Sequence, residues 1–137
     1  MKPIIYISIL IFSFGCFSSQ GIKKNKFNGT WIPNHEELGG KILPESYYAK
    51  QKLIISDSNY TVMAESIDKG IVQVGDGTMD IYGKEGVNAG KHFSCIYKLE
   101  HGELTVCYNL LGDHYPKEFS TQGKRFYFLS VFKKSNP

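Results

Sequence analysis

The sequence of 137 residues lacks the patterns by which catalytic and metal sites are usually recognised. It has no serine in a nucleophile elbow, no glycine loop that cradles a phosphate, and no cysteines or histidines at metal-ligand spacing. Its densest polar cluster, Asp113-His114 with Glu118, is one acid–base pair in principle but is more typical of a solvated loop. We therefore expect no enzyme, no metal and no cofactor.

The sequence also lacks a large excess of charge of either sign. The 16 Lys and Arg residues nearly balance the 13 Asp and Glu residues, which leaves a formal net charge of +3. The basic residues are scattered, apart from Lys23, Lys24 and Lys26 near the start and Lys133-Lys134 near the end. Recognition of nucleic acid needs basic side chains clustered on one face, so we expect no nucleic-acid partner.

Long apolar runs are missing except at the start of the chain. Lys2 is followed by an almost wholly apolar stretch from Ile4 to Phe14. This stretch is too short to cross a bilayer unaided, but it has about the length of the core of an export signal. Residues 1–19 are therefore predicted to be a signal peptide.

Two processing routes are compatible with this leader. In the first, the signal ends at Gly15, and Cys16 is lipidated, so the protein is a lipoprotein of the outer membrane or cell envelope that touches the membrane only through this anchor. In the second, cleavage near Ser19 gives a secreted or periplasmic protein. Both routes place the protein outside the cytoplasm, with residues 20–26 as a linker.

Helical periodicity is absent over any length that a stable helix needs. Nine Tyr and nine Phe residues favour sheet, and turn signals divide one domain, residues 27–134, into short strands with at most a helical turn over Glu45 to Lys50. Asp68-Lys69-Gly70 is expected to turn the chain, and Gly83, Gly86 and Gly90 to form a flexible loop. The eight expected strands are Phe27 to Ile32 (ended by Pro33), Lys52 to Ser56, Tyr60 to Glu65, Ile71 to Val74, Thr78 to Tyr82, His92 to Leu99, Glu103 to Leu110 and about Arg125 to Phe132.

The clearest pair of strands flanks His101-Gly102, a two-residue turn in which glycine supplies the positive φ that such turns need. The predicted register places Cys95 opposite Tyr108. Cys95 and Cys107 then face opposite sides of the sheet, so a disulfide is disfavoured although the compartment would permit one, and Cys95 is expected to be buried. A shift by one residue would pair the cysteines but turn one apolar set outward.

Strands that each have one apolar face bury those faces best by closing the sheet. We predict an all-β, eight-stranded antiparallel up-and-down barrel, whose interior is either filled by side chains or holds one small ligand. Trp31 is expected to plug one end with Lys133 or Lys134 across its indole, and ligand stacking is its alternative role. The side chains predicted to face inward are Trp31, Leu53, Ile55, Tyr60, Val62, Val72, Val74, Met79, Ile81, Phe93, Cys95, Tyr97, Leu99, Leu104, Val106 and Tyr108.

Four segments, taken in order, resemble an uncharacterised bacterial family of lipocalin-like domains. Gly29-Thr30-Trp31 resembles the Gly-x-Trp signature of lipocalins, and Gly39-Gly40-Lys41 resembles a loop typical of the family. The hairpin from Ile96-Tyr97-Lys98-Leu99 to Leu104-Thr105-Val106-Cys107 and the segment Pro116-Lys117-Glu118-Phe119-Ser120 complete the likeness. The resemblance implies an extracytoplasmic barrel and supplies no catalytic residues.

Two functions are compatible with such a barrel. The first is a binding module for a small apolar or amphipathic ligand. The side chains expected to hold this ligand are Trp31, Tyr60, Phe93, Tyr97 and Tyr108. The second is a filled barrel that acts as a protein-interaction, inhibitor or immunity-type envelope protein, with its contacts on the long loops Pro33 to Gln51 and Gly112 to Gly123. The expected partner is accordingly a small hydrophobic ligand or an envelope protein, and the expected state is a monomer.

Overall fold

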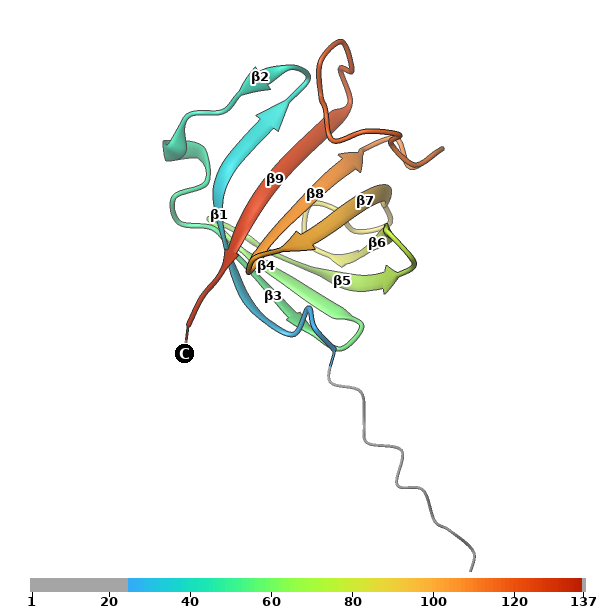
Figure 1. Ribbon diagram of the computed structural model, residues 1–137. Coiled ribbons are helices and arrows are strands. Elements are labelled where there is room, and N and C mark those ends of the chain that lie inside the picture. Colours follow the sequence, from blue (N-terminus) through green and yellow to red (C-terminus); the bar gives the residue numbers. More distant parts are fainter. Residues whose placement is uncertain (1–24, 137) are drawn as a thin grey trace, which may run out of the picture.

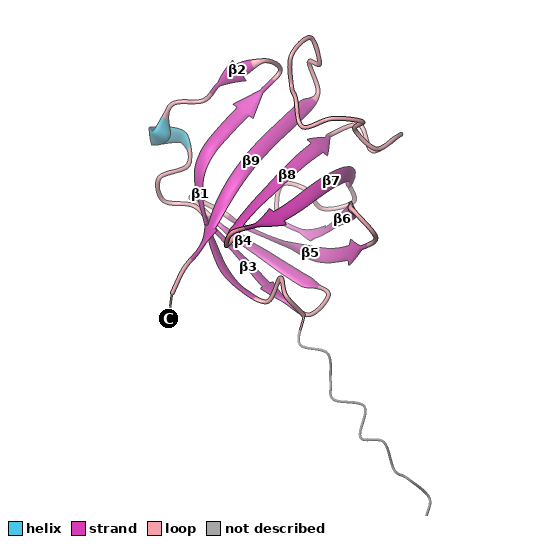
Figure 2. Cartoon of the chain, viewed as in Figure 1, coloured by secondary structure: helices cyan, strands magenta, loops and turns pink. Residues whose placement is uncertain are grey.

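The computed structural model describes residues 25–136, so the predicted signal peptide, Cys16 and most of the predicted linker lie outside the described residues. The described chain is a single curved sheet with one short helical turn, as Figures 1 and 2 show. Its elements are β1 (Gly29–Leu38), β2 (Lys41–Ile42), the 3-10 turn η1 (Glu45–Tyr47), β3 (Lys52–Ser56), β4 (Asn59–Met63), β5 (Ile67–Val74), β6 (Thr78–Glu85), β7 (His92–Glu100), β8 (Glu103–Asn109) and β9 (Tyr127–Lys134). Within residues 25–136, no helix has the length and apolar character needed to span a bilayer.

The predicted barrel is confirmed. From β3 to β9 each strand pairs with the next in antiparallel fashion, and β1 pairs with both β3 and β9, which closes the sheet into eight strands. The two-residue strand β2 pairs only with the last residues of β1 and adds a small flap outside the closed ring. Closure leaves the backbone groups of the first and last strands paired with each other, so the barrel has no long open edge.

The hairpin of β7 and β8 has the predicted register. Cys95 lies opposite Tyr108, and both residues of the His101-Gly102 turn have positive φ, 52° and 74°. Cys95 and Cys107 are both free and fully buried. They point to opposite faces, Cys95 into the barrel interior and Cys107 into a smaller apolar cluster on the outer side of the sheet.

The prediction that Pro33 ends the first strand is wrong. β1 continues through Pro33 to Leu38, and its pairing with β9 slips by one residue between Pro33 and His35. A bulge is one of the few places where a strand accepts proline, because the ladder hydrogen bond that proline cannot donate is already interrupted. The bulge also resets the alternation, so Glu36 faces the interior after Trp31 and Pro33.

The predicted turn at Asp68-Lys69-Gly70 is also wrong, because these residues belong to β5. Gly70 is directly opposite Tyr60, and a Cβ atom at Gly70 would lie 2.6 Å from Tyr60 Cε1 and still closer to the carbonyl oxygen of Tyr82. This glycine therefore makes room for a tyrosine ring rather than for a reversal of the chain. Gly83 likewise lies within β6 and not in the expected flexible loop.

The pattern of apolar residues did not predict which side chains of the last strand face the interior. The structure shows which of them do. Phe128, Ser130 and Phe132 face the interior, whereas Tyr127 and Leu129 join Cys107 in the outer cluster. Most of the predicted inward set packs in or against the main core. Tyr60 and Val62 face the interior cavity instead, and Val74 is 41% exposed at the end of β5.

Candidate ligand-binding cavity

The two ends of the barrel are built differently. The short turns β3–β4, β5–β6 and β7–β8 lie at one end, together with the start of β1 and the end of β9. The other end carries the long connections 39–51 and 110–126 and the shorter loop 86–91 (Figure 1). Thr121 ties the two long connections together, since its hydroxyl accepts from Gly40 N at 3.0 Å and donates to Glu37 Oε2 at 3.0 Å.

Trp31 closes the end with the short turns. Its side chain is 1% exposed, and its indole Nε1 donates to the carbonyl oxygen of Phe27 at 2.8 Å. The Phe27 ring meets the Tyr97 ring edge to face at 5.0 Å between centroids. The Lys134 ammonium lies 5.5 Å from the indole centroid, as predicted for this position. Trp31 is thus a structural plug.

A cavity of about 200 Å³ occupies the barrel interior and is partly open to solvent. Its wall reaches Gln51, Asn88 and Leu110, which lie at the end with the long loops. The sequence left open whether the interior is filled or hollow, and the structure is hollow. The apolar side chains of the wall are Pro33, Leu53, Ile55, Val62, Val72, Met79, Ile81, Phe93, Leu104, Val106, Leu110, Phe128 and Phe132.

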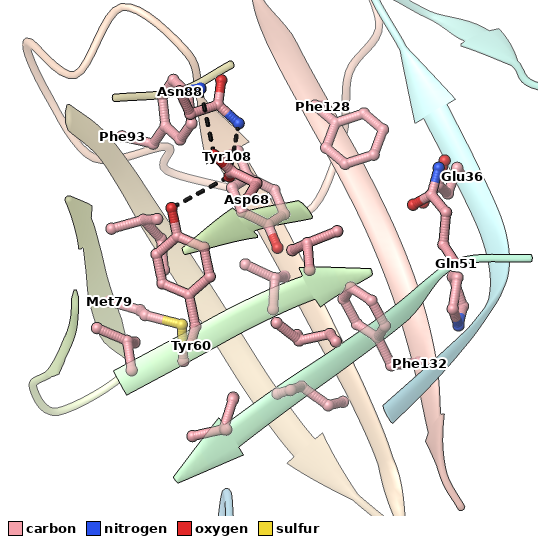
Figure 3. Close-up of a pocket in the computed structure, with 18 of the residues that line it drawn as sticks. Glu36, Gln51, Tyr60, Asp68, Met79, Asn88, Phe93, Tyr108, Phe128 and Phe132 are labelled. Carbon is pink, nitrogen blue, oxygen red and sulfur yellow. Dashed lines mark hydrogen bonds between the residues drawn. The ribbon is translucent and has the colours of Figure 1, made fainter. Parts of the chain in front are cut away.

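Asp68 is a buried carboxylate in this wall, and its hydrogen-bonding capacity is largely used. It accepts from Tyr60 Oη at 3.2 Å, from the backbone N of Asn88 at 3.2 Å and from Asn88 Nδ2 at 2.9 Å (Figure 3). These bonds fasten the 86–91 loop to β4 and β5. Asp68 therefore helps to shape the cavity mouth.

Glu36 is the second buried carboxyl group, and it has few partners. Only 3% of the residue is exposed, and its one side-chain hydrogen bond within the described chain comes from Ser130 Oγ at a long 3.4 Å. Burial raises the pKa of Glu36 to about 7, against the smaller opposing effects of Ser130 and of the His35 charge. Near neutral pH this group is therefore divided between its neutral and ionised forms.

Two tyrosines supply the other polar groups of the interior. Burial raises the pKa of Tyr60, and the neighbouring Asp68 carboxylate raises it further. Burial also raises the pKa of Tyr108, with smaller electrostatic contributions from Cys95, Glu36 and Tyr60. Both phenols therefore stay protonated. Figure 3 shows the Tyr108 ring pointing into the cavity, and among the described residues its hydroxyl has no hydrogen-bond partner.

The structure brings together three of the five residues predicted to hold a ligand. Tyr60, Phe93 and Tyr108 line the cavity. Trp31 and Tyr97 do not; they pack at the closed end, where the Tyr97 hydroxyl donates to the carbonyl oxygen of Gly75 at 3.1 Å.

Sequence reasoning missed Glu36, Asp68 and Asn88. Glu36 lies beyond Pro33, where the sequence predicts the end of a strand, and Asp68 lies in a predicted turn. Asn88 lies in an irregular loop. A polar residue in an otherwise apolar interior is invisible to a pattern that looks for apolar alternation. Continuing β1 past Pro33 with one residue inserted would have placed Glu36 correctly.

The polar cluster of the β8–β9 loop lies away from the cavity. His114 Nδ1 lies 2.8 Å from Asp113 Oδ1, and both side chains are more than half exposed. Its other ring nitrogen lies 2.9 Å from the Tyr127 hydroxyl, on the outer side of the sheet. Within residues 25–136, no group of three or more His, Cys, Asp or Glu side chains is arranged to hold a metal ion.

Fold and cavity together define an eight-stranded antiparallel barrel with one hollow, mainly apolar interior. A crystal structure of an uncharacterized protein from Bacteroides eggerthii DSM 20697 has a similar fold, with a TM-score of 0.51 over 80% of this chain and 99% of that chain, at 10% sequence identity. This likeness concerns the fold alone. No protein-family model matches the chain, and no curated protein matches it either.

Proposed function

We propose that this protein is a binding module that holds one small apolar or amphipathic molecule inside its barrel. The observation that carries the proposal is the cavity of about 200 Å³, whose mainly apolar wall bears a few polar groups. Ligand sites commonly have this composition, and an apolar cavity of about 150 Å³ is enough to hold benzene. The expected ligand is therefore about the size of one ring with a short chain.

The sequence resemblance to lipocalin-like domains supports this proposal, because barrels of eight strands commonly hold one small ligand. We extend it to a monomer that is a binding protein and not an enzyme. The leader predicts that it works outside the cytoplasm, either lipidated at Cys16 or cleaved near Ser19.

A substitution that fills the cavity tests the proposal. Val62 is half-buried in the cavity wall, so Val62→Phe occupies the space that a ligand needs. We expect the unmodified protein to retain single-ring compounds from a panel in native mass spectrometry, and Val62→Phe to retain none.

Val74→Phe is the matched control, because Val74 is exposed at the opposite end of the barrel. It should bind the panel as the unmodified protein does. Absence of any adduct on the unmodified protein, or equal adducts on all three proteins, would contradict the proposal.

A protein-interaction role is the second candidate, and the exposed apolar side chains of the two long loops favour it. Ile42 is 70% exposed and Leu111 is 59% exposed. In a pull-down from envelope extracts, a partner that survives Val62→Phe but is lost with Ile42→Ser would support this role over ligand binding.

A further inference from the structure

The buried charged groups of the cavity wall are both acidic. Glu36 and Asp68 are both buried in its wall. Every lysine and the arginine among residues 25–136 is exposed, including Lys52 at the cavity mouth. Burying a carboxylate without a positive partner is costly, and neither Glu36 nor Asp68 forms a salt bridge within residues 25–136.

Glu36 has fewer hydrogen-bond partners than Asp68. Asp68 already accepts three hydrogen bonds, whereas Glu36 accepts one long bond from Ser130. The Tyr108 hydroxyl, whose pKa Glu36 helps to raise, has no hydrogen-bond partner in the described chain. Glu36 and Tyr108 therefore have acceptor sites to spare inside an apolar cavity.

Among residues 25–136, no positive side chain pairs directly with Glu36. On its own strand, the His35 ring lies 2.8 Å from Glu37 and forms an ion pair with that residue when protonated. From β9 the neutral Ser130 faces it, and from β8 the protonated Tyr108. The remaining titratable groups of the cavity wall are Tyr60 and Asp68, which hydrogen-bond to each other, and Lys52, which is exposed at the mouth.

We propose, resting on the proposed function, that the ligand is a small apolar amine whose ammonium group pairs with Glu36. An ammonium has three donors and no acceptor, and the Glu36 carboxylate and the Tyr108 hydroxyl supply acceptors for it. The apolar part of the ligand lies against the aliphatic and aromatic wall. The raised pKa of Glu36, about 7, is the value expected of this carboxyl group while no cation faces it.

Three probe molecules of similar shape test which charge the cavity prefers in its ligand. These are 2-phenylethylamine, 2-phenylethanol and 3-phenylpropionate, whose binding to the purified protein is measured by calorimetry at pH 8. We expect the amine to bind at least ten-fold more tightly than the alcohol, and the carboxylate to bind more weakly than either. Two carboxylates in a low-dielectric site favour the cation and repel the anion.

Substitution at Glu36 assigns the effect to this residue. Glu36→Gln should lower the amine affinity at least ten-fold and leave the alcohol affinity within two-fold. Glu37→Gln removes the same charge from the next residue of β1, whose side chain does not line the cavity, and should leave all three affinities unchanged. Tyr108→Phe keeps the ring and should weaken the amine alone.

Binding of the amine should also depend on pH. The amine stays protonated from pH 6 to 8, while Glu36 loses its proton across this range. The affinity of the unmodified protein for the amine should therefore rise with pH, and that of Glu36→Gln should stay flat.

The same measurements distinguish failure of the amine proposal from failure of the proposed ligand-binding function. If none of the three probes binds, the cavity is not a binding site for such molecules and both proposals are overturned. If the alcohol binds as tightly as the amine, or if the carboxylate binds best, or if Glu36→Gln binds the amine unchanged, ligand binding stands and the amine assignment is overturned.

Discussion

Burial of Glu36 makes the stability of the empty barrel depend on pH. The folded-state pKa of about 7 lies above the usual value of 4.5, so the unfolded chain releases this proton first as the pH rises. The contribution of Glu36 is therefore most favourable below pH 4.5, and stability is lost as the pH rises through about 7. A shift of this size corresponds to a loss of at most roughly 3 kcal/mol.

Glu36→Gln should remove this loss, because the amide stays neutral. Measured by urea denaturation, the variant should match the unmodified protein at pH 4 and exceed it in free energy of unfolding at pH 8. Glu37→Gln serves again as the control for loss of a charge on β1. The interpretation fails if Glu36→Gln is less stable than the unmodified protein at pH 8.

At the scale of elements, β1 performs two tasks on either side of its bulge. Its first half carries Trp31, which closes one end of the barrel, and its second half carries Glu36 into the cavity. Without the extra residue, Glu36 would point to solvent, because side chains alternate along a strand. The bulge thus places the polar group that distinguishes this interior.

β5 depends on Gly70 for a steric reason rather than a conformational one. Its φ is not in the left-handed region, and an added Cβ would meet the Tyr60 ring and the Tyr82 backbone. Gly70→Ala should therefore destabilise the protein by about 2 kcal/mol or more in thermal or urea unfolding, since overpacked sites relax poorly.

Gly77→Ala gives the matched comparison. Gly77 has φ of 71° and open space around it, so alanine there meets only backbone strain of roughly 1 kcal/mol. If Gly70→Ala proves as mild as Gly77→Ala, the space at Gly70 is not required by Tyr60.

For the whole molecule, the two ends of the described chain and the long loops beside the cavity lie at opposite ends of the barrel. The described chain begins and finishes at the closed end (Figure 1), and the wall of the cavity reaches the loops of the opposite end at Gln51, Asn88 and Leu110. A membrane anchor upstream of residue 25 would therefore join the molecule at the end that Trp31 closes.

Substitution of Cys16 distinguishes the two predicted processing routes. If Cys16 is lipidated, Cys16→Ser should move the protein from the membrane fraction to the soluble fraction of a bacterium that expresses it, because the variant lacks the acyl chains that would anchor it. Metabolic labelling with a fatty acid should be lost in parallel. Recovery of the unmodified protein in the soluble fraction would instead indicate cleavage near Ser19.

The sequence by itself determined the closed sheet, the hairpin at His101-Gly102 and the burial of Cys95, because strand alternation and turn chemistry are local properties of neighbouring residues. Only the tertiary structure decided that the interior is hollow and that Glu36 faces it. A cavity depends on how large side chains from eight strands divide one volume, and the facing of Glu36 depends on a bulge that forms against β9. Neither is encoded in a residue and its immediate neighbours, and both belong to the closed barrel as a whole.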